Sequence, residues 1–289
     1  MNLFPRVGVL GLGTMGAGIA QVFAASGRDV VALETGPDRV AAGLGAVADF
    51  LAAAVARGKL TEDDRRTTLD RITGTTDVAG LAGVDLVVES VTEDADAKKA
   101  LLSEVAAAVG TDTPILTNTS ALSVTDLAAA LPHSERVAGL HFFNPAPLMR
   151  TVEVVRALQT DPFLVERLTA LVASLDGKEA VVVDDRPGFL LNALLLPYLN
   201  DVVQEYDDGL ASAEDIDTAL TLGLGYARGP FEMLDLIGLD VHLRATEGAH
   251  AATHDSRYAP PPLLRRMVAA GRLGAKSGRG FRTGEESTR

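Results

Sequence analysis

Residues 7–21 read VGVLGLGTMGAGIAQ and place an apolar run directly before three glycines spaced G-x-G-x-x-G. A helical pattern follows the third glycine, so the stretch is typical of a strand that turns tightly into a helix. Glycines in this pattern allow the tight turn and let a pyrophosphate approach backbone N–H groups. The motif alone is a weak signal, because glycine-rich turns are common. The residues after the later strands must therefore decide whether this is a dinucleotide site.

Composition narrows the class of protein. The chain has 289 residues, of which 47% are hydrophobic, and this favours one or two globular domains. It has no cysteine, which excludes disulfides, thiolate metal sites and a cysteine nucleophile. A formal charge of -13 disfavours nucleic acid and anionic membrane surfaces as partners. Because the sequence has neither a long uninterrupted apolar run nor a basic, apolar leader, we expect a soluble, cytoplasmic protein without a membrane partner.

The first part of the chain alternates between short β-branched runs and alanine-rich helical stretches. This pattern predicts an α/β fold with a Rossmann-like, doubly wound parallel sheet. The expected strands are 7–10, 30–33, 86–88, 115–117, 137–140, 152–155 and 181–183. Residues 37–72 are too many for one crossover helix and predict an inserted helical hairpin. Its first helix should end near Gly58, and the second should begin at Thr61, which forms a capping-box pattern with Asp64.

The alternation stops after the sequence DDRPGF, and the rest of the chain predicts helices only. Residues 189–203 are apolar on nearly every side, which is typical of a helix that its neighbours bury. Ser212 and Asp215 indicate another helix start, and Gly223 is expected to end that helix. Two further helices are expected after Pro230 and Pro262.

We therefore expect two domains. Residues 1–185 should form the dinucleotide-binding domain, with the hairpin at about 37–72 inserted in it. Residues 186–289 should form an all-helical domain, and its apolar content predicts a homodimer built mainly through residues beyond Pro187.

Polar residues follow the expected strands at the edge where open α/β sheets bind ligands. Glu34 follows the second strand about 20 residues after the glycines, where a carboxylate can bind a ribose 2′-hydroxyl and repel a 2′-phosphate. The order of strand, glycine-rich loop, helix, strand and acidic residue favours NAD over NADP as the cofactor. Glu34 could instead be a solvated loop residue. Later strands end in further polar side chains, namely Glu89, Glu93, Asn118, Ser120, His141 and Asn144.

His141 lies at this edge, and Glu153 lies on another expected strand of the same sheet. A histidine there could be only a packed structural residue. In the sequence TVEVV, however, Glu153 points to the opposite face from Val152 and Val154. If Glu153 faces His141, it can hold the imidazole in one tautomer and stabilise the imidazolium. The pair would then act as a general base.

The chain resembles the short-chain 3-hydroxyacyl-CoA dehydrogenases, most closely their bacterial 3-hydroxybutyryl-CoA members. The resemblance covers almost the whole length and rests on GLGTMGAGIAQ, NTSALSV, GLHFFNPAPLMRTVEVV, DDRPGFLLNALLLPYLNDVV, DIDTALTLGLGYARGPFEMLD and GAKSGRGF. It implies an NAD-binding Rossmann-like domain with a helical hairpin that helps to bind CoA, and a helical domain that usually makes a homodimer.

The resemblance also implies residue roles. His141 is similar to the base that takes the proton from the 3-hydroxyl while hydride leaves C3 for the nicotinamide, and Glu153 to its carboxylate partner. Ser120 and Asn192 match the residues that hydrogen-bond the substrate near the reacting oxygen. The expected cofactor-binding residues are Gly11, Gly13, Thr14, Met15, Gly16, Glu34, Glu93, Lys98 and Asn118.

The sequence departs from the family pattern at three positions. Ala121 stands where a second serine is usual, Ala193 where a basic residue is usual, and Arg282 where an aromatic residue is usual. Because the four catalytic-type residues are present, these departures concern acyl specificity and contacts of the helical domain. No metal is expected: His250 and His254 are four apart on a possible helix, but no H-E-x-x-H pattern accompanies them.

Three functions stay open at this point. The first is oxidation of a short-chain (S)-3-hydroxyacyl-CoA with NAD in fatty acid metabolism. The second is the same hydride chemistry on a carrier-protein-linked 3-hydroxyacyl group, a free 3-hydroxy acid or a sugar acid in a biosynthetic pathway. The third, a non-catalytic NAD-binding structural protein, is disfavoured by the presence of all four catalytic-type residues.

Overall fold

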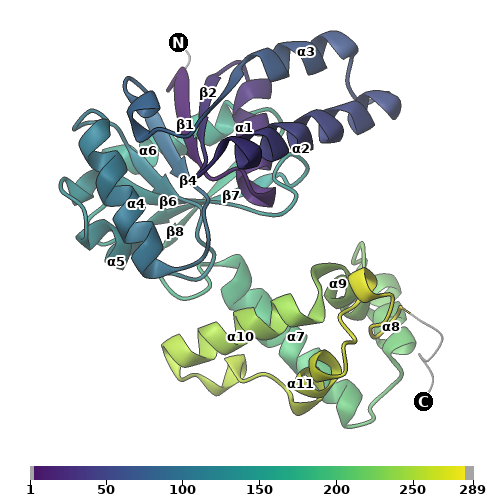
Figure 1. The fold of residues 1–289 in the computed structure, drawn as a ribbon. Helices are drawn as coiled ribbons and strands as arrows, with labels where there is room; N and C mark the ends of the chain where they lie inside the picture. The colour runs from purple at the N-terminus through teal and green to yellow at the C-terminus, as the bar shows by residue number, and fades with distance from the viewer. Residues whose placement is uncertain (1–2, 284–289) are drawn as a thin grey trace. The chain divides into compact units, whose positions relative to one another are not determined.

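The computed structural model describes residues 3–283, and the chain forms two compact units, Met1–Phe189 and Leu190–Arg289 (Figure 1). The eight strands found within residues 3–283 lie in the first unit: β1 (Arg6–Leu10), β2 (Asp29–Leu33), β3 (Ile72–Thr75), β4 (Leu86–Glu89), β5 (Ile115–Thr117), β6 (Val137–Phe142), β7 (Thr151–Arg156) and β8 (Glu179–Asp184). Its helices are α1 (Thr14–Ala25), α2 (Pro37–Ala56), α3 (Glu62–Asp70), α4 (Ala95–Ala108), α5 (Val124–Ala129) and α6 (Pro162–Ala173).

The strands form one sheet in the order β3-β2-β1-β4-β5-β6-β7-β8. The six strands from β3 to β6 in this order run parallel, and the strand order reverses between β1 and β4. The expected Rossmann-like, doubly wound fold is therefore confirmed. One difference is that β7 runs antiparallel to β6, with β8 parallel to β7. Residues 143–150 connect β6 to β7 and are fewer than the dozen or so that a parallel crossover needs.

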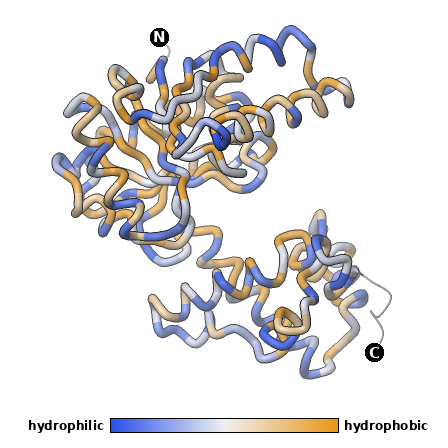
Figure 2. The backbone as a smooth tube through the Cα atoms, viewed as in Figure 1, coloured by the Kyte–Doolittle hydropathy of each residue, from blue (hydrophilic) through white to orange (hydrophobic). Residues whose placement is uncertain are grey.

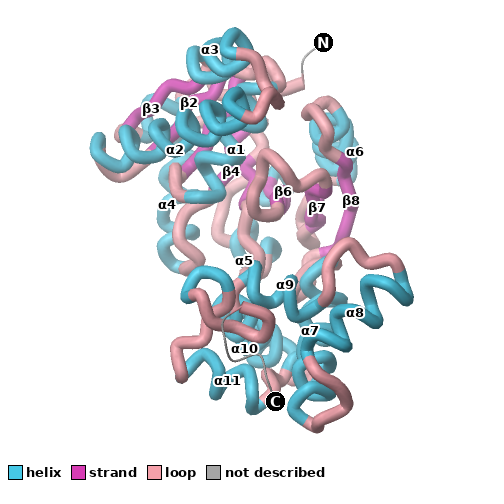
Figure 3. The backbone as a smooth tube through the Cα atoms, turned by 90° about the vertical axis from the view of Figure 1, so that its right-hand side faces the viewer, coloured by secondary structure: helices cyan, strands magenta, loops and turns pink. Residues whose placement is uncertain are grey.

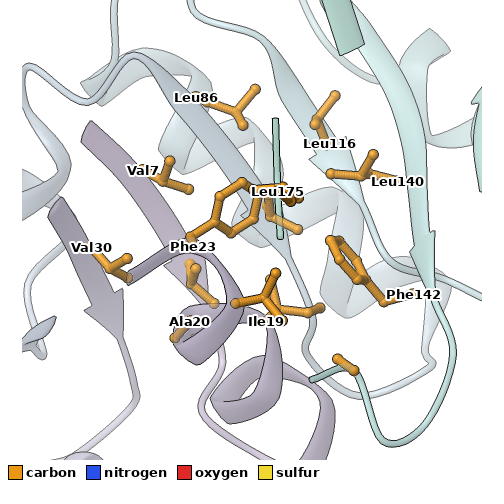
Figure 4. Close-up of a cluster of buried hydrophobic side chains, with 14 of the residues drawn as sticks. Val7, Ile19, Ala20, Phe23, Val30, Leu86, Leu116, Leu140, Phe142 and Leu175 are labelled. Atoms are coloured by element: carbon orange, nitrogen blue, oxygen red, sulfur yellow. The ribbon is translucent and has the colours of Figure 1, made fainter. Parts of the chain in front are cut away.

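Side chains of the strands alternate between two helical layers, because successive residues of a strand point to opposite faces. Val7 and Val9 belong to the core on the face covered by α1 and α6, whereas Leu10 belongs to the core on the face covered by α4 and α5. Figure 4 shows the first of these cores, in which the Phe23 ring of α1 meets the Phe142 ring edge-on at 6.3 Å. Full burial of a side chain such as Phe23 contributes about 2 to 3 kcal/mol.

The strand β3 was not among the expected strands. It is short, it contains Gly74, and of its four residues only Ile72 is buried. A run with one buried residue lacks the apolar alternation that predicts a strand. Its pairing with β2 through backbone hydrogen bonds nevertheless extends the sheet by one strand.

The helices α2 and α3 form a hairpin beside α1 (Figure 1). The expected capping box is confirmed: the Thr61 hydroxyl accepts from the Asp64 N–H at 3.1 Å, and Asp64 accepts from the Thr61 N–H at 3.2 Å. Among the described residues, α2 is the one helix with the length and apolar composition to cross a membrane. Composition of this kind is weak evidence, and Val47 and Leu51 of α2 are buried in the core of the first unit.

The second unit contains helices and loops, as expected (Figure 3). Its helices are α7 (Leu191–Asp207), α8 (Ala213–Leu224), α9 (Pro230–Ile237), α10 (Leu239–Thr253) and α11 (Pro262–Ala269). Ser212 caps α8 by accepting from the Asp215 N–H. The expected stop at Gly223 was two residues too early: α8 continues to Leu224, and Gly225, with φ of 74°, ends it in the left-handed conformation that glycine adopts without strain.

The expectation that α7 is buried on nearly every side was also wrong. Its buried residues are Leu196, Leu199, Asn200 and Val203, whereas Leu194 is 68% exposed. The small core of this unit reaches only one side of the helix, and it includes Phe231 and Leu264. The hydrophobic segments of the second unit appear in orange in Figure 2.

Candidate active site

The glycine-rich loop joins β1 to α1 at the point where the strand order reverses. Gly11 has φ of 86°, and a Cβ on it would lie 2.7 Å from the Ser90 carbonyl oxygen. A Cβ on Gly16 would lie 1.9 Å from the Gly11 carbonyl oxygen. Neither position therefore accommodates a side chain, and this lets α1 begin directly against the end of β1.

The N-terminus of α1 is suited to an anion. No side chain caps it, and its first turn holds no acidic residue. A Cβ on Gly13 would meet nothing within 4 Å, and Gly13 and Thr14 line an open cavity. The first-turn residues Thr14, Met15 and Gly16 have backbone N–H groups without partners inside the helix. These groups and the helix dipole fit the pyrophosphate of a dinucleotide.

Glu34 lies beside this loop, at the end of β2. Its carboxylate accepts from the Leu12 N–H at 2.9 Å and from the Thr35 N–H at 2.9 Å. A cavity of about 400 Å³ opens next to it, lined by the glycine-rich loop, α1, α2 and residues 144–147, and Glu34 and Arg39 are among its lining residues. A carboxylate can accept about four hydrogen bonds, so Glu34 retains acceptor capacity for a ribose hydroxyl.

The polar residues after β4 and β5 contact one another. One Glu93 oxygen accepts from the Thr119 hydroxyl at 2.5 Å, from the Ser120 N–H at 2.9 Å and from the Ala121 N–H at 3.2 Å. The other Glu93 oxygen lies 3.2 Å from Lys98 Nζ. Burial raises the pKa of Glu93, but the Thr119 hydrogen bond, the Lys98 charge and the Ser120 N–H outweigh it and hold the pKa below its usual value.

Asn118 connects this loop to the histidine strand. Its side-chain oxygen accepts from the Phe142 N–H at 2.8 Å, and its own N–H donates to the Glu89 carbonyl at 2.8 Å. Because β5 and β6 are parallel neighbours, Ser120 and His141 both lie toward the same carboxyl edge of the sheet. Ser120 is exposed there.

His141 and Glu153 face each other across the antiparallel β6–β7 pair. They are direct partners in the register, and Nδ1 of His141 lies 2.7 Å from Oε2 of Glu153. Both residues are at least 95% buried, since His141 is 5% exposed and Glu153 1%. An ionised carboxylate can only accept, so Nδ1 carries the hydrogen and Nε2 is left as the proton-accepting nitrogen of the neutral ring.

Two aromatic rings that the sequence did not single out pack on His141. The Phe143 ring centroid lies 4.6 Å from that of His141, and the Phe189 centroid lies 5.5 Å away, both edge-on. Phe189 has φ of 49°, a conformation that a bulky residue seldom adopts. In the sequence, Phe189 was marked only as the last residue of DDRPGF. That pattern does not predict a contact with a histidine 48 positions earlier in the chain.

Asn192 is the second residue of α7 and is half-buried in the second unit. The other predicted catalytic residues lie in the first unit. His250 and His254 do not share a helix, because α10 ends at Thr253 and His254 has φ of 55°. Among residues 3–283, no group of three or more His, Asp or Glu side chains is placed to hold a metal ion.

Comparison with known proteins decides the family. A family model described as 3-hydroxyacyl-CoA dehydrogenase, NAD binding domain, matches residues 6–186, and one described as its C-terminal domain matches residues 188–284. The chain belongs to the 3-hydroxyacyl-CoA dehydrogenase family. This match confirms two expectations. The cofactor is NAD, and the protein is an NAD-dependent oxidoreductase.

Individual relatives match over nearly their full length. A 3-hydroxybutyryl-CoA dehydrogenase of Mycobacterium tuberculosis is 41% identical over 279 residues, covering 96% of this chain and 98% of that protein. The mitochondrial hydroxyacyl-coenzyme A dehydrogenase of Sus scrofa is 40% identical, covering 96% and 91%. The crystal structure of (S)-3-hydroxybutyryl-CoA dehydrogenase from Ralstonia eutropha has a TM-score of 0.92 and 40% identity, covering 98% and 100%.

The three residues that depart from the expected pattern make the following contacts in the structure. Ala121 keeps the backbone N–H that donates to Glu93. The Ala193 carbonyl accepts from the Tyr258 hydroxyl at 3.1 Å, a contact that needs no particular side chain. Arg282 forms an ion pair, with its Nε 3.6 Å from the Asp217 carboxylate.

Proposed function

We propose that this dehydrogenase oxidises a short-chain (S)-3-hydroxyacyl-CoA, such as 3-hydroxybutyryl-CoA, to the 3-oxoacyl-CoA in a reversible reaction. The observation that carries the proposal is the buried His141–Glu153 pair at the carboxyl edge of the sheet. The names of the relatives support the substrate class.

His141 is the general base of the proposed reaction. Its Nε2 accepts the proton of the 3-hydroxyl group as the C3–H bond breaks, and in the reverse direction it returns that proton. Glu153 fixes the tautomer through Nδ1 and stabilises the imidazolium. The Phe143 and Phe189 rings limit the orientations that the imidazole can adopt. When bound, NAD supplies the acceptor for the hydride.

Ser120 and Asn192 hold the reacting oxygen in this proposal. Their side chains can donate hydrogen bonds to the oxygen on C3 as it gains carbonyl character. Such donors also place C3 for transfer, and misplacement by about 1 Å can cost about 100-fold in rate.

The cofactor site in the proposal follows the loop and strand ends already described. The first-turn N–H groups of α1 would hold the pyrophosphate, and Glu34 would accept from the adenosine ribose. Glu93 and Asn118 would lie near the nicotinamide ribose. Lys98 would serve the cofactor site only through Glu93, because its side chain is 1% exposed.

A homodimer through the second unit is part of the proposal. Many large apolar side chains of this unit are exposed, and a dimer interface that covers some of them would remove apolar surface from water. They are Leu190, Leu191, Leu194, Leu210, Leu222, Leu224, Tyr226, Leu236, Ile237 and Val241.

One assay separates the candidate substrates. NADH formation should be measured with (S)-3-hydroxybutyryl-CoA, with free 3-hydroxybutyrate and with the same acyl group on a phosphopantetheine-bearing carrier protein. We expect the CoA ester to have the highest kcat/KM. A higher kcat/KM with the carrier-protein-linked group or with the free acid would identify that compound class as the substrate instead.

A further inference from the structure

The sequence DDRPGF ends the first unit with a tight turn over residues 186–189. The Phe189 N–H donates to the Arg186 carbonyl at 2.9 Å and closes the turn. Pro187 and Gly188 occupy its two central positions, and Gly188 has φ of 77°. A type II β-turn favours proline at its second residue and needs positive φ at its third. The proline and glycine of the sequence are therefore the residues that this turn requires.

Phe189 is the side chain that the turn places against the candidate active site. It is 3% exposed and belongs to the same core as Val124 and Val155. Its ring centroid lies 5.5 Å from that of His141, with an angle of 62° between the two ring planes. Its φ of 49° is unfavourable for a bulky residue, so contacts around the turn must hold this conformation.

Asp185 joins the start of this turn to two fixed parts of the first unit. Its N–H donates to the carbonyl of Arg156, the last residue of β7, at 3.0 Å. Its Oδ2 atom accepts from the Ser123 hydroxyl at 2.9 Å and from the Thr125 N–H at 2.7 Å, both at the start of α5. Hydrogen bonds to an ionised carboxylate are stronger than those between neutral groups. Because Val124 of α5 is fully buried in the core, this anchor does not move with the turn.

We propose that Asp185 is a positioning residue that fastens the turn at residues 186–189 to α5 and β7. The Phe189 ring is thereby held against the His141 imidazole, and Asp185 acts on the reaction only through that ring. The kinetic consequence rests on the proposed function, in which His141 is the general base.

The kinetic test is a double-mutant cycle between Asp185 and Phe189. We expect Asp185→Ala to lower kcat about 10-fold, since a group misplaced by about 1 Å can cost up to about 100-fold. KM for the hydroxyacyl substrate should change little, because the orientation of the base matters in the transition state. In the Phe189→Ala background, Asp185→Ala should cost less than about 3-fold, because the ring that it positions is gone. Equal losses in the two backgrounds would overturn the proposal.

A conservative variant tests the hydrogen bonds themselves. Asp185→Asn keeps a side-chain oxygen that can accept from both Ser123 and Thr125. Its kcat should therefore stay within about 3-fold of the wild type, as expected when neutral hydrogen bonds replace charge-assisted ones. A loss as large as that of Asp185→Ala would contradict the anchoring role.

The matched control is Asp184→Ala, which removes the neighbouring carboxylate of the same sequence. That side chain is 71% exposed and pairs with Arg156 on the surface, so kcat should change less than about 2-fold. If circular dichroism shows that Asp185→Ala does not fold, Gly188→Ala takes its place, because a side chain is strained at the φ of Gly188. It should show the same dependence on Phe189, and additive losses would again contradict the proposal.

A second measurement needs no substrate. The chain has five histidines, and the ring C–H signals of His141 are those missing from the NMR spectrum of His141→Gln. An aromatic ring shifts the signals of protons beside it, so Phe189→Ala should move the His141 signals. We expect Asp185→Ala to move them in the same direction and Asp184→Ala to leave them in place.

Unmoved His141 signals in Asp185→Ala would overturn the positioning role. A wild type without activity on any hydroxyacyl substrate would instead refute the proposed function. The NMR comparison would still decide whether Asp185 positions Phe189 against His141.

Discussion

Nδ1 of His141 lies 2.7 Å from Oε2 of Glu153, and the two residues are direct partners across the antiparallel β6–β7 pair. The sheet therefore sets the orientation of the imidazole through backbone register and not through a flexible loop. Rigid placement of this kind limits the base to one productive geometry.

Replacing Glu153 with Gln should lower kcat by about 100-fold, because an amide can neither stabilise the imidazolium nor reliably select its tautomer. The dissociation constant for NADH should change little, since Glu153 is 1% exposed and lies beside His141 on the neighbouring strand. The control Glu179→Gln removes an exposed carboxylate on neighbouring β8 that pairs with Arg150. Steady-state kinetics and NADH fluorescence titration check both variants. Comparable losses in kcat for the two variants would remove Glu153 from the mechanism.

Replacing Glu34 with Ala should narrow the preference for NAD over NADP. The carboxylate repels a 2′-phosphate and accepts from a ribose hydroxyl, and a charge-assisted hydrogen bond contributes about 1.5 to 3 kcal/mol, or roughly tenfold or more in discrimination. The ratio of kcat/KM for the two cofactors measures this, with Asp38→Ala in the first turn of α2 as the control. Equal efficiency of the wild type with both cofactors would refute the role of Glu34.

The second unit should mediate a homodimer. Light scattering should give twice the chain mass of 30.1 kDa at micromolar concentration. Substituting Leu222, 83% exposed, with Asp should weaken any dimer that buries it, because a charge would enter an apolar interface. A wild-type monomer would contradict this prediction.

Stability should fall below pH 6.5 because of His242 in the second unit. Burial lowers the pKa of this histidine from 6.5 to about 4, and Nε2 donates to the Asn200 side-chain oxygen at 3.1 Å. The unfolded chain therefore binds the proton more tightly between these values, and the folded state loses up to about 3 kcal/mol as the pH falls from 6.5 to 4. Above pH 6.5, His242 adds no pH dependence.

Urea unfolding at pH 7 and pH 4.5 checks this behaviour, with His242→Gln as the comparison. The variant should lose less stability between the two pH values than the wild type. Equal losses would show that His242 does not titrate as its burial indicates.

Sequence patterns predicted the features that depend on local periodicity. The glycine-rich turn, the Thr61 capping box and the placement of Glu153 on the opposite strand face from Val152 and Val154 follow from fixed spacings in helices and strands. That Glu153 faces His141 was only a condition of the proposed base. The register of β6 and β7 was needed to make these two residues a direct pair, and only the short connection between the strands hinted at it.

The remaining features depend on contacts between distant segments. Lys98 was expected among the cofactor-binding residues, but no pattern predicted its burial, which follows from the packing of α4 over the carboxylate of Glu89. Phe189 packs on His141 through a backbone conformation that no pattern specifies. The strand β3 forms by pairing with β2, despite a weak local preference.

The most direct test of the central claim is the steady-state oxidation of (S)-3-hydroxybutyryl-CoA, followed by NADH formation, for the wild type and a folded His141→Gln variant. Circular dichroism and NADH binding establish that the variant is intact. We expect turnover by the wild type and a decrease in kcat of about 10² to 10⁴-fold in the variant, the usual range for loss of a general base. Near-wild-type turnover by His141→Gln would contradict the account, because it would remove the histidine from the proton transfer.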